Sequence, residues 1–390
     1  MSNMTINIKK SASYAGQAVK FKKIGSGMSK FLIAATSPGG ATYDTDVVVF
    51  QQFSLLSSSS GHKVALYGGF SSSVVPYGYI WDPGSSAWST RFDPPATDSG
   101  EGRFTGVGAA TNDGKFMLAG GIVGFFTSTT NNSNIYDPGS NSWTSTVDVT
   151  GFTNGPAYEF PIPATATNFR TGEIFIFGGS DLPAGPEVWR DQLVVWNGSA
   201  WNTANNSTIV LPKPDSGAHL LSMAAKDTGS STELMLFTGS YGFGPSYQQT
   251  LYYWTQNSTS PVSGTWSYVT GSTGSSESMP TSAVCLMWED NRNRWTAMSL
   301  DPSQTPNIWV SSNDGATWTS YTYSVGSWSN VDINLNSIPD GKIFAVADPA
   351  RNQFYISNVP ESAGPGDKQE LWKLVVASSP ASSTLTKLYP

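Results

Sequence analysis

The chain has 390 residues, of which 13% are charged, and its 28 acidic and 21 basic residues leave a formal net charge of −7. Aromatic residues reach 13%, with 14 tryptophans, and 39 glycines and 24 prolines accompany them. So many aromatic and so few charged residues exclude a disordered chain, and no apolar stretch approaches the roughly 18 residues of a membrane-spanning helix. The composition predicts an all-β, turn-rich globular protein.

The first 44 residues differ in charge and pattern from the rest. Six lysines and no acidic residue precede Asp44. Three stretches have strand character, at 5–9, 17–23 and 30–36. A basic segment ahead of an acidic body is either a solvated strand face or a docking segment for an acidic partner surface. We expect residues 1–44 to form an anchoring module or an extra blade, and residues 45–390 to form one domain.

From about residue 46 one pattern recurs. It consists of an apolar run that ends in a glycine pair, a loop, a second apolar run, a tight turn and a tryptophan. The glycine-pair segments are Val64–Gly69, Phe116–Gly121 and Ile174–Gly179, with a weaker copy at Leu234–Gly239. The closing tryptophans are Trp88, Trp143, Trp201, Trp266 and Trp318. Their spacing suits a unit of four antiparallel strands of about 5–6 residues each. Radial repetition of such units predicts a β-propeller.

These motifs resemble known repeats. The glycine pair with a spaced tryptophan resembles Kelch-type repeats of galactose oxidase-like propellers. The segment 311–318, with Asn313 at the usual aspartate position, resembles a sialidase-type Asp-box, a hairpin between third and fourth strands. Both resemblances imply a propeller and say little about function. Five tryptophan-marked units and a sixth near 343–389 favour six blades; the N-terminal segment would allow a seventh.

One face of the predicted propeller carries the candidate ligand residues. The connections after the second and fourth strands emerge on one face, the usual ligand face, and here they are aromatic. Converging exposed aromatics form an interaction patch that suits sugar rings, unless the rings fold back over the blade interfaces. The predicted ligand residues are Tyr77, Phe125, Phe126, Glu187, Trp189, Arg190, Tyr241, Phe243 and Tyr247.

Enzyme chemistries of such propellers can be tested on the residues. A copper radical oxidase needs two histidines together, but His62 and His219 map to opposite faces. A sialidase needs three arginines, and only Arg91, Arg103 and Arg190 avoid the wrong face. Tyr158 and Glu159 would form its tyrosine–glutamate pair. Another glycosidase needs two carboxylates. Those available are Asp93, Asp98, Glu101, Glu159, Asp181 and Glu187. We expect no metal or cofactor, and Cys285 to be inert core.

The sequence favours a non-catalytic recognition protein over an enzyme. It would bind a cell-surface receptor or glycan through the aromatic face, with neither nucleic acid nor membrane as partner. No apolar secretory segment opens the sequence, so we expect cytoplasmic synthesis. Release as a virion component, such as a phage tail or capsid-surface protein, would follow, with residues 1–44 contacting other virion subunits. The alternatives are a glycan hydrolase of sialidase-like type and an intracellular Kelch-like adaptor.

Overall fold

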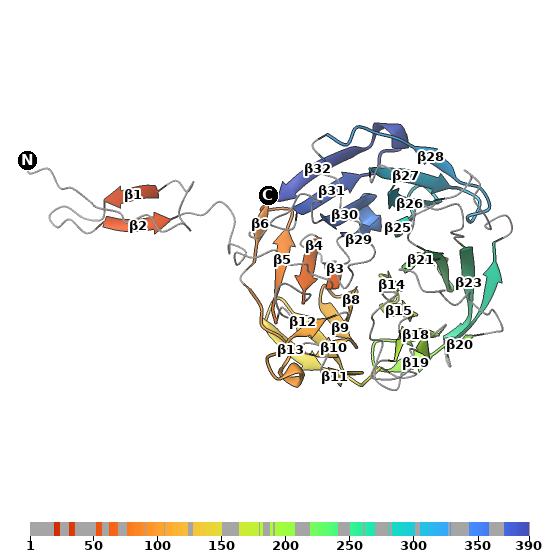
Figure 1. Cartoon of the computed structure of the whole chain (residues 1–390), viewed down its shortest axis with the longest axis horizontal. Helices are drawn as coiled ribbons and strands as arrows, with labels where there is room; N and C mark the ends of the chain where they lie inside the picture. The colour runs from red at the N-terminus through yellow and green to blue at the C-terminus, as the bar shows by residue number, and fades with distance from the viewer. Residues whose placement is uncertain are drawn as a thin grey trace, which may run out of the picture.

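Six antiparallel sheets follow one another along the chain and stand around a common axis as the blades of a propeller (Figure 1). This computed structural model confirms the predicted all-β class and six blades. It describes residues 19–23, 31–35, 52–56, 62–68, 76–89, 91–104, 106–123, 128–149, 164–178, 180–181, 188–189, 192–206, 219–240, 250–259, 262–269, 280, 283–300, 305–326, 328, 343–358 and 370–389. Among these residues, none belongs to a helix long and apolar enough to cross a membrane.

Each blade is a meander whose first strand lies nearest the axis and whose fourth strand is outermost. Blade 1 contains β3 (Gln52–Leu56), β4 (Lys63–Tyr67), β5 (Gly78–Asp82) and β6 (Ala87–Trp88). Blade 2 contains β8 (Val107–Ala110), β9 (Phe116–Ala119), β12 (Ser133–Asp137) and β13 (Ser142–Ser145). Blade 3 contains β14 (Ala164–Asn168), β15 (Glu173–Phe177), β18 (Leu193–Trp196) and β19 (Trp201–Thr203). Blade 4 contains β21 (His219–Asp227), β22 (Thr232–Ser240), β23 (Thr250–Thr259) and β24 (Val262–Tyr268). Blade 5 contains β25 (Ala283–Glu289), β26 (Arg294–Leu300), β27 (Pro306–Ser311) and β28 (Thr319–Tyr321). Blade 6 contains β29 (Ile343–Asp348), β30 (Gln353–Asn358), β31 (Glu370–Val375) and β32 (Thr384–Tyr389).

Smaller elements surround the blades. The strands β7 (Arg103–Phe104), β10 (Ile122–Val123) and β11 (Ser128–Thr129) form a three-stranded sheet. A two-stranded pair consists of β16 (Ser180–Asp181) and β17 (Val188–Trp189), and β20 (Asn205–Asn206) runs parallel to β24 at the outer edge of blade 4. Short 3-10 turns span Ala96–Asp98, Pro349–Arg351 and Pro380–Ser382.

The core lies between the blades. Successive side chains of a strand point to opposite faces of its sheet, and each blade is covered on both sides by its neighbours. In β15, Ile174 and Ile176 pack toward blade 2, while Phe175 and Phe177 pack toward blade 4. All four are buried. This two-sided burial explains why the second strands of the repeats are unbroken apolar runs rather than alternating ones.

The repeat tryptophans occupy equivalent positions, as predicted. Trp88, Trp143, Trp201 and Trp266 pair with an aromatic residue of the third strand of their own blade, and Trp318 immediately precedes β28. The repeat predicts that each ring packs between the strands of its own blade. Each ring instead fills the interface with the preceding blade. The radial geometry explains this, since the widening gap between outer strands needs a large side chain.

The hairpin at 311–318 joins the third and fourth strands of blade 5, as expected. The Asn313 side chain closes it by accepting a hydrogen bond from the Thr317 backbone at 3.0 Å, and Ser311 Oγ accepts one from the Gly315 backbone at 2.9 Å. Asp314 and Gly315 both have positive φ, 51° and 84°. The tight turn therefore depends on a glycine at one position and on side-chain capping at the others.

The ring closes through side chains, without strand exchange, because blades 1 and 6 each consist of four consecutive strands. At this seam Trp88 and Tyr389 meet edge-on with ring centroids 5.6 Å apart. His62 Nδ1 lies 2.7 Å from Oδ1 of the fully buried Asp348. The seventh-blade alternative is therefore wrong.

The N-terminal strands stand outside the ring. β1 (Val19–Lys23) and β2 (Phe31–Ala35) form an antiparallel pair that lies apart from the blades in Figure 1. They correspond to two of the three predicted strands, and the third, at 5–9, lies outside the described residues. The domain boundary at residue 44 and the anchoring role remain predictions.

Candidate functional site

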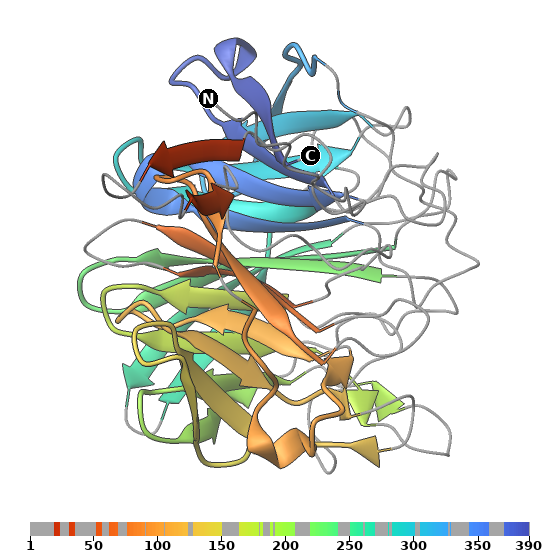
Figure 2. The same ribbon diagram turned by 90° about the vertical axis from the view of Figure 1, so that its left-hand side faces the viewer.

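The two faces of the ring differ in how the strands are connected. First and second strands join through short turns, at 111–115, 169–172, 228–231, 290–293 and 349–352, and third and fourth strands turn on this same side. We call it the short-turn face. Second and third strands join through longer segments, such as 120–132 and 178–192, on the opposite side. We call this the long-loop face; it faces the viewer in Figure 1, and Figure 2 views the ring edge-on.

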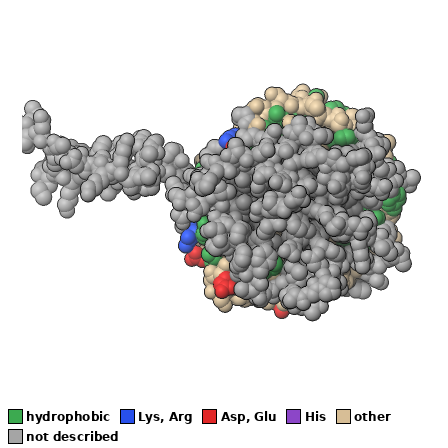
Figure 3. All heavy atoms as spheres, viewed as in Figure 1, with side chains coloured by type: hydrophobic (Ala, Val, Ile, Leu, Met, Phe, Trp, Pro, Cys, Tyr) green, Lys and Arg blue, Asp and Glu red, His purple; other side chains and the backbone are tan. Residues whose placement is uncertain are grey.

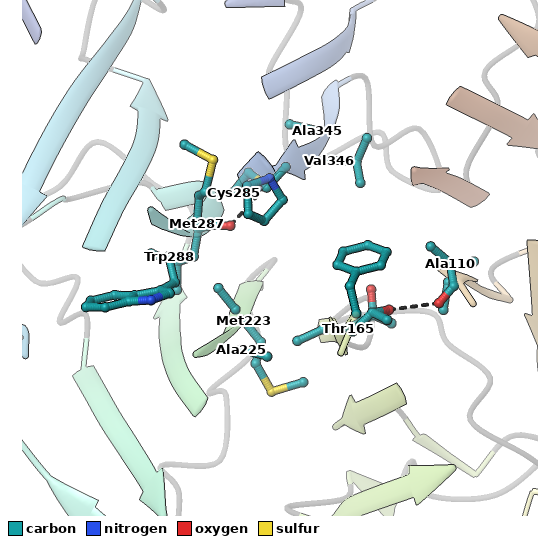
Figure 4. A pocket seen from close by; sticks show the side chains of 18 residues that line it. Ala110, Thr165, Met223, Ala225, Cys285, Met287, Trp288, Ala345 and Val346 are labelled. Carbon is teal, nitrogen blue, oxygen red and sulfur yellow. Dashed lines mark hydrogen bonds between the residues drawn. The ribbon is translucent and has the colours of Figure 1, made fainter. Parts of the chain in front are cut away.

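A central channel runs between the first strands (Figure 4). The space between its walls that no atom fills is about 620 Å³ with open solvent included, and β8, β14, β21, β25 and β29 contribute the walls. Small residues such as Gly108, Ala166, Ala224 and Ala345 recur along the walls. The blades converge on the axis, so only small side chains fit where the taper is narrowest.

The described channel wall is neutral. Its lining residues include no Asp, Glu, Lys, Arg or His. Polar groups are supplied by Thr165 and Thr167, and Thr167 Oγ1 donates a hydrogen bond to the Ala110 carbonyl at 3.0 Å, joining blades 2 and 3. This wall can accommodate an uncharged group but supplies no acid or base, so catalytic groups would have to come from outside it.

Cys285 also lines the channel, as inert core. It is buried, and burial raises the pKa of its thiol to about 12. A thiol held protonated in this way is a poor nucleophile and metal ligand. Within the described parts of the chain, no group of three or more His, Cys, Asp or Glu side chains could hold a metal ion.

Of the predicted ligand residues, Tyr77 is the one whose side chain the structure describes. It is half-buried at the rim of blade 1, edge-on to Tyr79 with centroids 5.8 Å apart, and the Arg91 guanidinium lies 4.9 Å from its ring centroid. Trp189 is described only by its backbone, which pairs with Ser180. The other predicted ligand residues lie outside the described residues and stay predictions: Phe125, Phe126, Glu187, Arg190, Tyr241, Phe243 and Tyr247. Figure 3 views this face, where described side chains appear around the margin.

Asp98 and Arg103, both counted as available for chemistry by the sequence, are instead locked together. The Arg103 Nε lies 2.8 Å from Asp98 Oδ2, and both side chains are fully buried. A carboxylate saturated by a guanidinium and shielded from solvent cannot act on a sugar. The sialidase expectation thereby loses one of its three arginines.

The remaining sequence predictions about arginine placement hold. Arg170, Arg292, Arg294 and Arg351 all lie at the short-turn face, each beside a carboxylate. His62 precedes β4 at this same face, whereas His219 begins β21 at the opposite one. The two histidines are therefore separated by the thickness of the ring, as the sequence implied.

Sequence reasoning missed the channel and the buried ion pair. The channel had a signal, namely the glycine and alanine residues at corresponding places in successive first strands, such as 108–110, 224–225 and 345–347. The ion pair had none, because two charged residues five positions apart in a connection are usually solvent-exposed.

Comparisons with known proteins give a likeness in fold. No protein-family model matches the chain, and no curated protein matches it. Among solved structures it is similar to the Penicillium chrysogenum α-L-arabinanase complexed with arabinobiose. The two chains share 13% identity with a TM-score of 0.49, over 89% of this chain and 99% of the other.

This finding corrects the prediction of a non-catalytic recognition protein. The solved structure is of an arabinanase, an enzyme of the class named above as the alternative, a glycan hydrolase. At this low identity the likeness transfers no residue and no substrate to this chain. The Kelch and Asp-box resemblances receive no confirmation from the comparisons. Any case for hydrolysis has to come from the chain's own residues.

Proposed function

We propose that this chain is a glycan hydrolase whose active site lies on the long-loop face, where the first strands that surround the central channel begin. The observation that carries the proposal is the convergence of five first strands on one neutral channel. All five strands begin at the long-loop face. Residues from several blades can therefore approach a single substrate there, on connections held by a rigid scaffold.

The chemistry would need two carboxylates, one as general acid and one as base or nucleophile. Asp98 is not available as either carboxylate, because it forms a buried ion pair with Arg103. Asp93 and Glu101 are described and exposed, in the connection between blades 1 and 2. Three further carboxylates belong in sequence to the connections that precede or interrupt blade 3. They are Glu159, Asp181 and Glu187.

A neutral glycan is the favoured substrate class. The chain carries a net charge of −7, which repels an anionic sugar, and the channel wall presents small apolar and hydroxyl groups. The three-arginine grip needed for a sialic acid carboxylate is weakened by the burial of Arg103. Aromatic residues such as Trp189 would stack against sugar rings at the rim.

The test is hydrolysis of a panel of neutral polysaccharides, arabinan among them, alongside a sialylated substrate. We expect reducing-sugar release from a neutral member. Asp181→Asn, Glu187→Gln and Glu159→Gln are made one at a time, and Asp113→Asn in a short turn of blade 2 is the matched control. At least one test variant should lose on the order of 10²–10⁴-fold in rate, while the control retains it. A wild-type chain that cleaves nothing on the panel would refute the proposal.

A further inference from the structure

The described wall of the central channel lies toward the short-turn face. First strands begin at the long-loop face and end at the short-turn face. The wall extends past the ends of β14 and β29 to Phe169 and Pro349, which belong to the short turns. Among the residues whose side chains are described, those nearer the long-loop face, such as Val107, Ala164 and Phe344, do not line it. This part of the channel, which we call the short-turn cavity, is therefore separate from the place proposed for hydrolysis.

The first strands expose one backbone edge to this cavity. In the described sheets, β8, β14, β21, β25 and β29 each stand at the end of the strand order and pair with a second strand on one side only. The unpaired edge of such a strand carries N–H and C=O groups without ladder partners, and here it faces the axis of the ring. Small residues such as Gly108, Ala166 and Ala345 leave space beside these groups. The wall therefore offers backbone donors and acceptors as well as apolar carbon.

One hydroxyl of the chain already uses such an edge. Thr167 Oγ1 in β14 donates to the Ala110 carbonyl in β8 of the neighbouring blade, at 3.0 Å (Figure 4). Thr165 lies on the same side of β14 as Thr167, two residues earlier, and its half-buried side chain also lines the cavity. A molecule that carries hydroxyl groups can therefore bond to the wall in the way that Thr167 does.

Phe169 adds an apolar surface that crosses the channel. It follows β14 of blade 3, yet its side chain packs against the cluster between blades 6 and 1. The same side chain lines the cavity. Sites for small molecules commonly combine an aromatic surface with a few polar groups that fix the orientation of the ligand. Phe169 and the strand edges provide these two components.

The chemistry of the wall selects one class of ligand. The described lining includes no Asp, Glu, Lys, Arg or His, so an ion would lose hydration without gaining an opposite charge. A wholly apolar molecule would leave the strand-edge groups without hydrogen bonds, which costs free energy for each group. The unfilled space of about 620 Å³, open solvent included, falls within the roughly 300–1,000 Å³ of small-molecule pockets. A small neutral molecule with several hydroxyl groups fits all three conditions.

We propose that the short-turn cavity binds one small neutral polyhydroxylated molecule, of the size of a monosaccharide. Its hydroxyl groups would bond to the first-strand edges and to Thr165, and its C–H groups would contact Phe169. The inference uses the cavity wall and none of the carboxylates of the long-loop face, so it does not depend on hydrolysis.

The test is calorimetric titration of the full chain with the neutral compounds glucose, arabinose and myo-inositol. Glucuronate and glucosamine are the charged counterparts. The titrations are repeated on Thr165→Val, which removes a hydroxyl from the wall, and on Ala345→Leu, which adds bulk at a half-buried alanine of the wall. Thr144→Val is the matched control, because it removes an exposed hydroxyl from the outer strand β13.

We expect saturable binding of at least one neutral compound at a single site, with a dissociation constant below about 10 mM. The charged compounds should bind on the order of 10-fold more weakly than the best neutral one. Thr165→Val should weaken binding about 3- to 10-fold, as expected for one lost hydrogen bond. Ala345→Leu should abolish binding, and Thr144→Val should leave it unchanged.

Three results would overturn the inference. The first is that no neutral compound binds saturably up to about 100 mM, which would mean that the cavity takes only water. The second is unchanged binding in Ala345→Leu, or in Thr165→Val should Ala345→Leu not fold. The third is a charged compound that binds as tightly as the best neutral one. None of these results bears on the hydrolase proposal, which the polysaccharide panel tests by itself.

Discussion

The two faces of the ring differ in their connections and side-chain contacts, although the same strands form both. At the short-turn face, polar and charged side chains link neighbouring blades. Arg170 pairs with Asp227 between blades 3 and 4, Lys226 with Asp314 between blades 4 and 5, and His62 with Asp348 across the closing seam. The connections on the long-loop face are longer, and Asp98–Arg103 is a buried pair within one of them and the adjoining strand.

This difference between the faces predicts where substitutions can be tolerated. Because blade-to-blade packing and the short-turn ion pairs fix the ring, the longer connections can vary without dismantling it. Substitutions in the scaffold should therefore lower stability and spare activity, and substitutions in the long connections should do the reverse.

The largest stability effect is expected between the blades. Trp201 is 4% exposed and its Nε1 donates to Ser133 Oγ at 3.0 Å, whereas Trp143 occupies the same position in blade 2 but is only half-buried. Trp201→Ala should cost about 3–5 kcal/mol, and Trp143→Ala clearly less. Urea unfolding followed by fluorescence measures both. Equal losses would show that burial at the blade interface does not set the contribution of these rings.

A comparable loss is expected at the short-turn face from Glu289→Gln. Glu289 is fully buried and accepts hydrogen bonds from Arg292 at 2.5 Å and Arg294 at 2.9 Å. The same arginines donate to the Val376 and Ala377 carbonyls of blade 6. Neutralising the carboxylate should cost about 3 kcal/mol, the lower end for a broken buried pair. Thermal unfolding measures the loss, and an unchanged Tm would show that this contact does not stabilise the ring.

A smaller effect is expected at the closing seam. Tyr389 packs against both Trp88 and Trp81, with ring centroids 5.6 Å and 6.3 Å away. Tyr389→Leu keeps an apolar side chain but loses the aromatic contacts, so about 0.5–1.5 kcal/mol should be lost. Tyr321→Leu, in a fourth strand away from the seam, is the control. Equal effects at the two positions would argue that the seam is no more sensitive than the rest of the ring.

Part of this architecture could be predicted from the sequence. The period of the repeat and the turn residues determine four strands per blade, and Trp88, Trp143 and Trp201 mark the fourth strands. The blade interface that each ring fills could not be predicted, since it depends on how blades are inclined about the axis. Asp98 and Arg103 were misjudged because composition cannot tell a buried carboxylate from an exposed one. Tyr77, predicted as a ligand residue, packs against the cluster between blades 6 and 1, and its role in binding stays a prediction.

The smallest effect concerns pH. Hydrogen bonds from Arg170, at 2.8 Å for Nη2 to Oδ1, hold the pKa of the Asp227 carboxyl below its usual value. A carboxyl with a lowered pKa stabilises the fold above its unfolded pKa of about 3.9, and this contribution is lost as the pH falls through the lower folded value. Arg170→Met should therefore lower Tm slightly at pH 7, and the gap to wild type should close in acid. A gap that persists unchanged at pH 2 would contradict this assignment.

The central claim is that the short-turn face contributes stability and the long-loop face contributes activity. One paired measurement tests it most directly. For Glu159→Gln, Asp181→Asn, Glu187→Gln and Glu289→Gln, kcat on the cleaved glycan and the urea midpoint are determined on the same preparations. We predict that at least one of the first three loses on the order of 10²–10⁴-fold in kcat with the wild-type midpoint, while Glu289→Gln keeps kcat with a lowered midpoint. Loss of kcat in folded Glu289→Gln, with all three long-loop variants fully active, would contradict it.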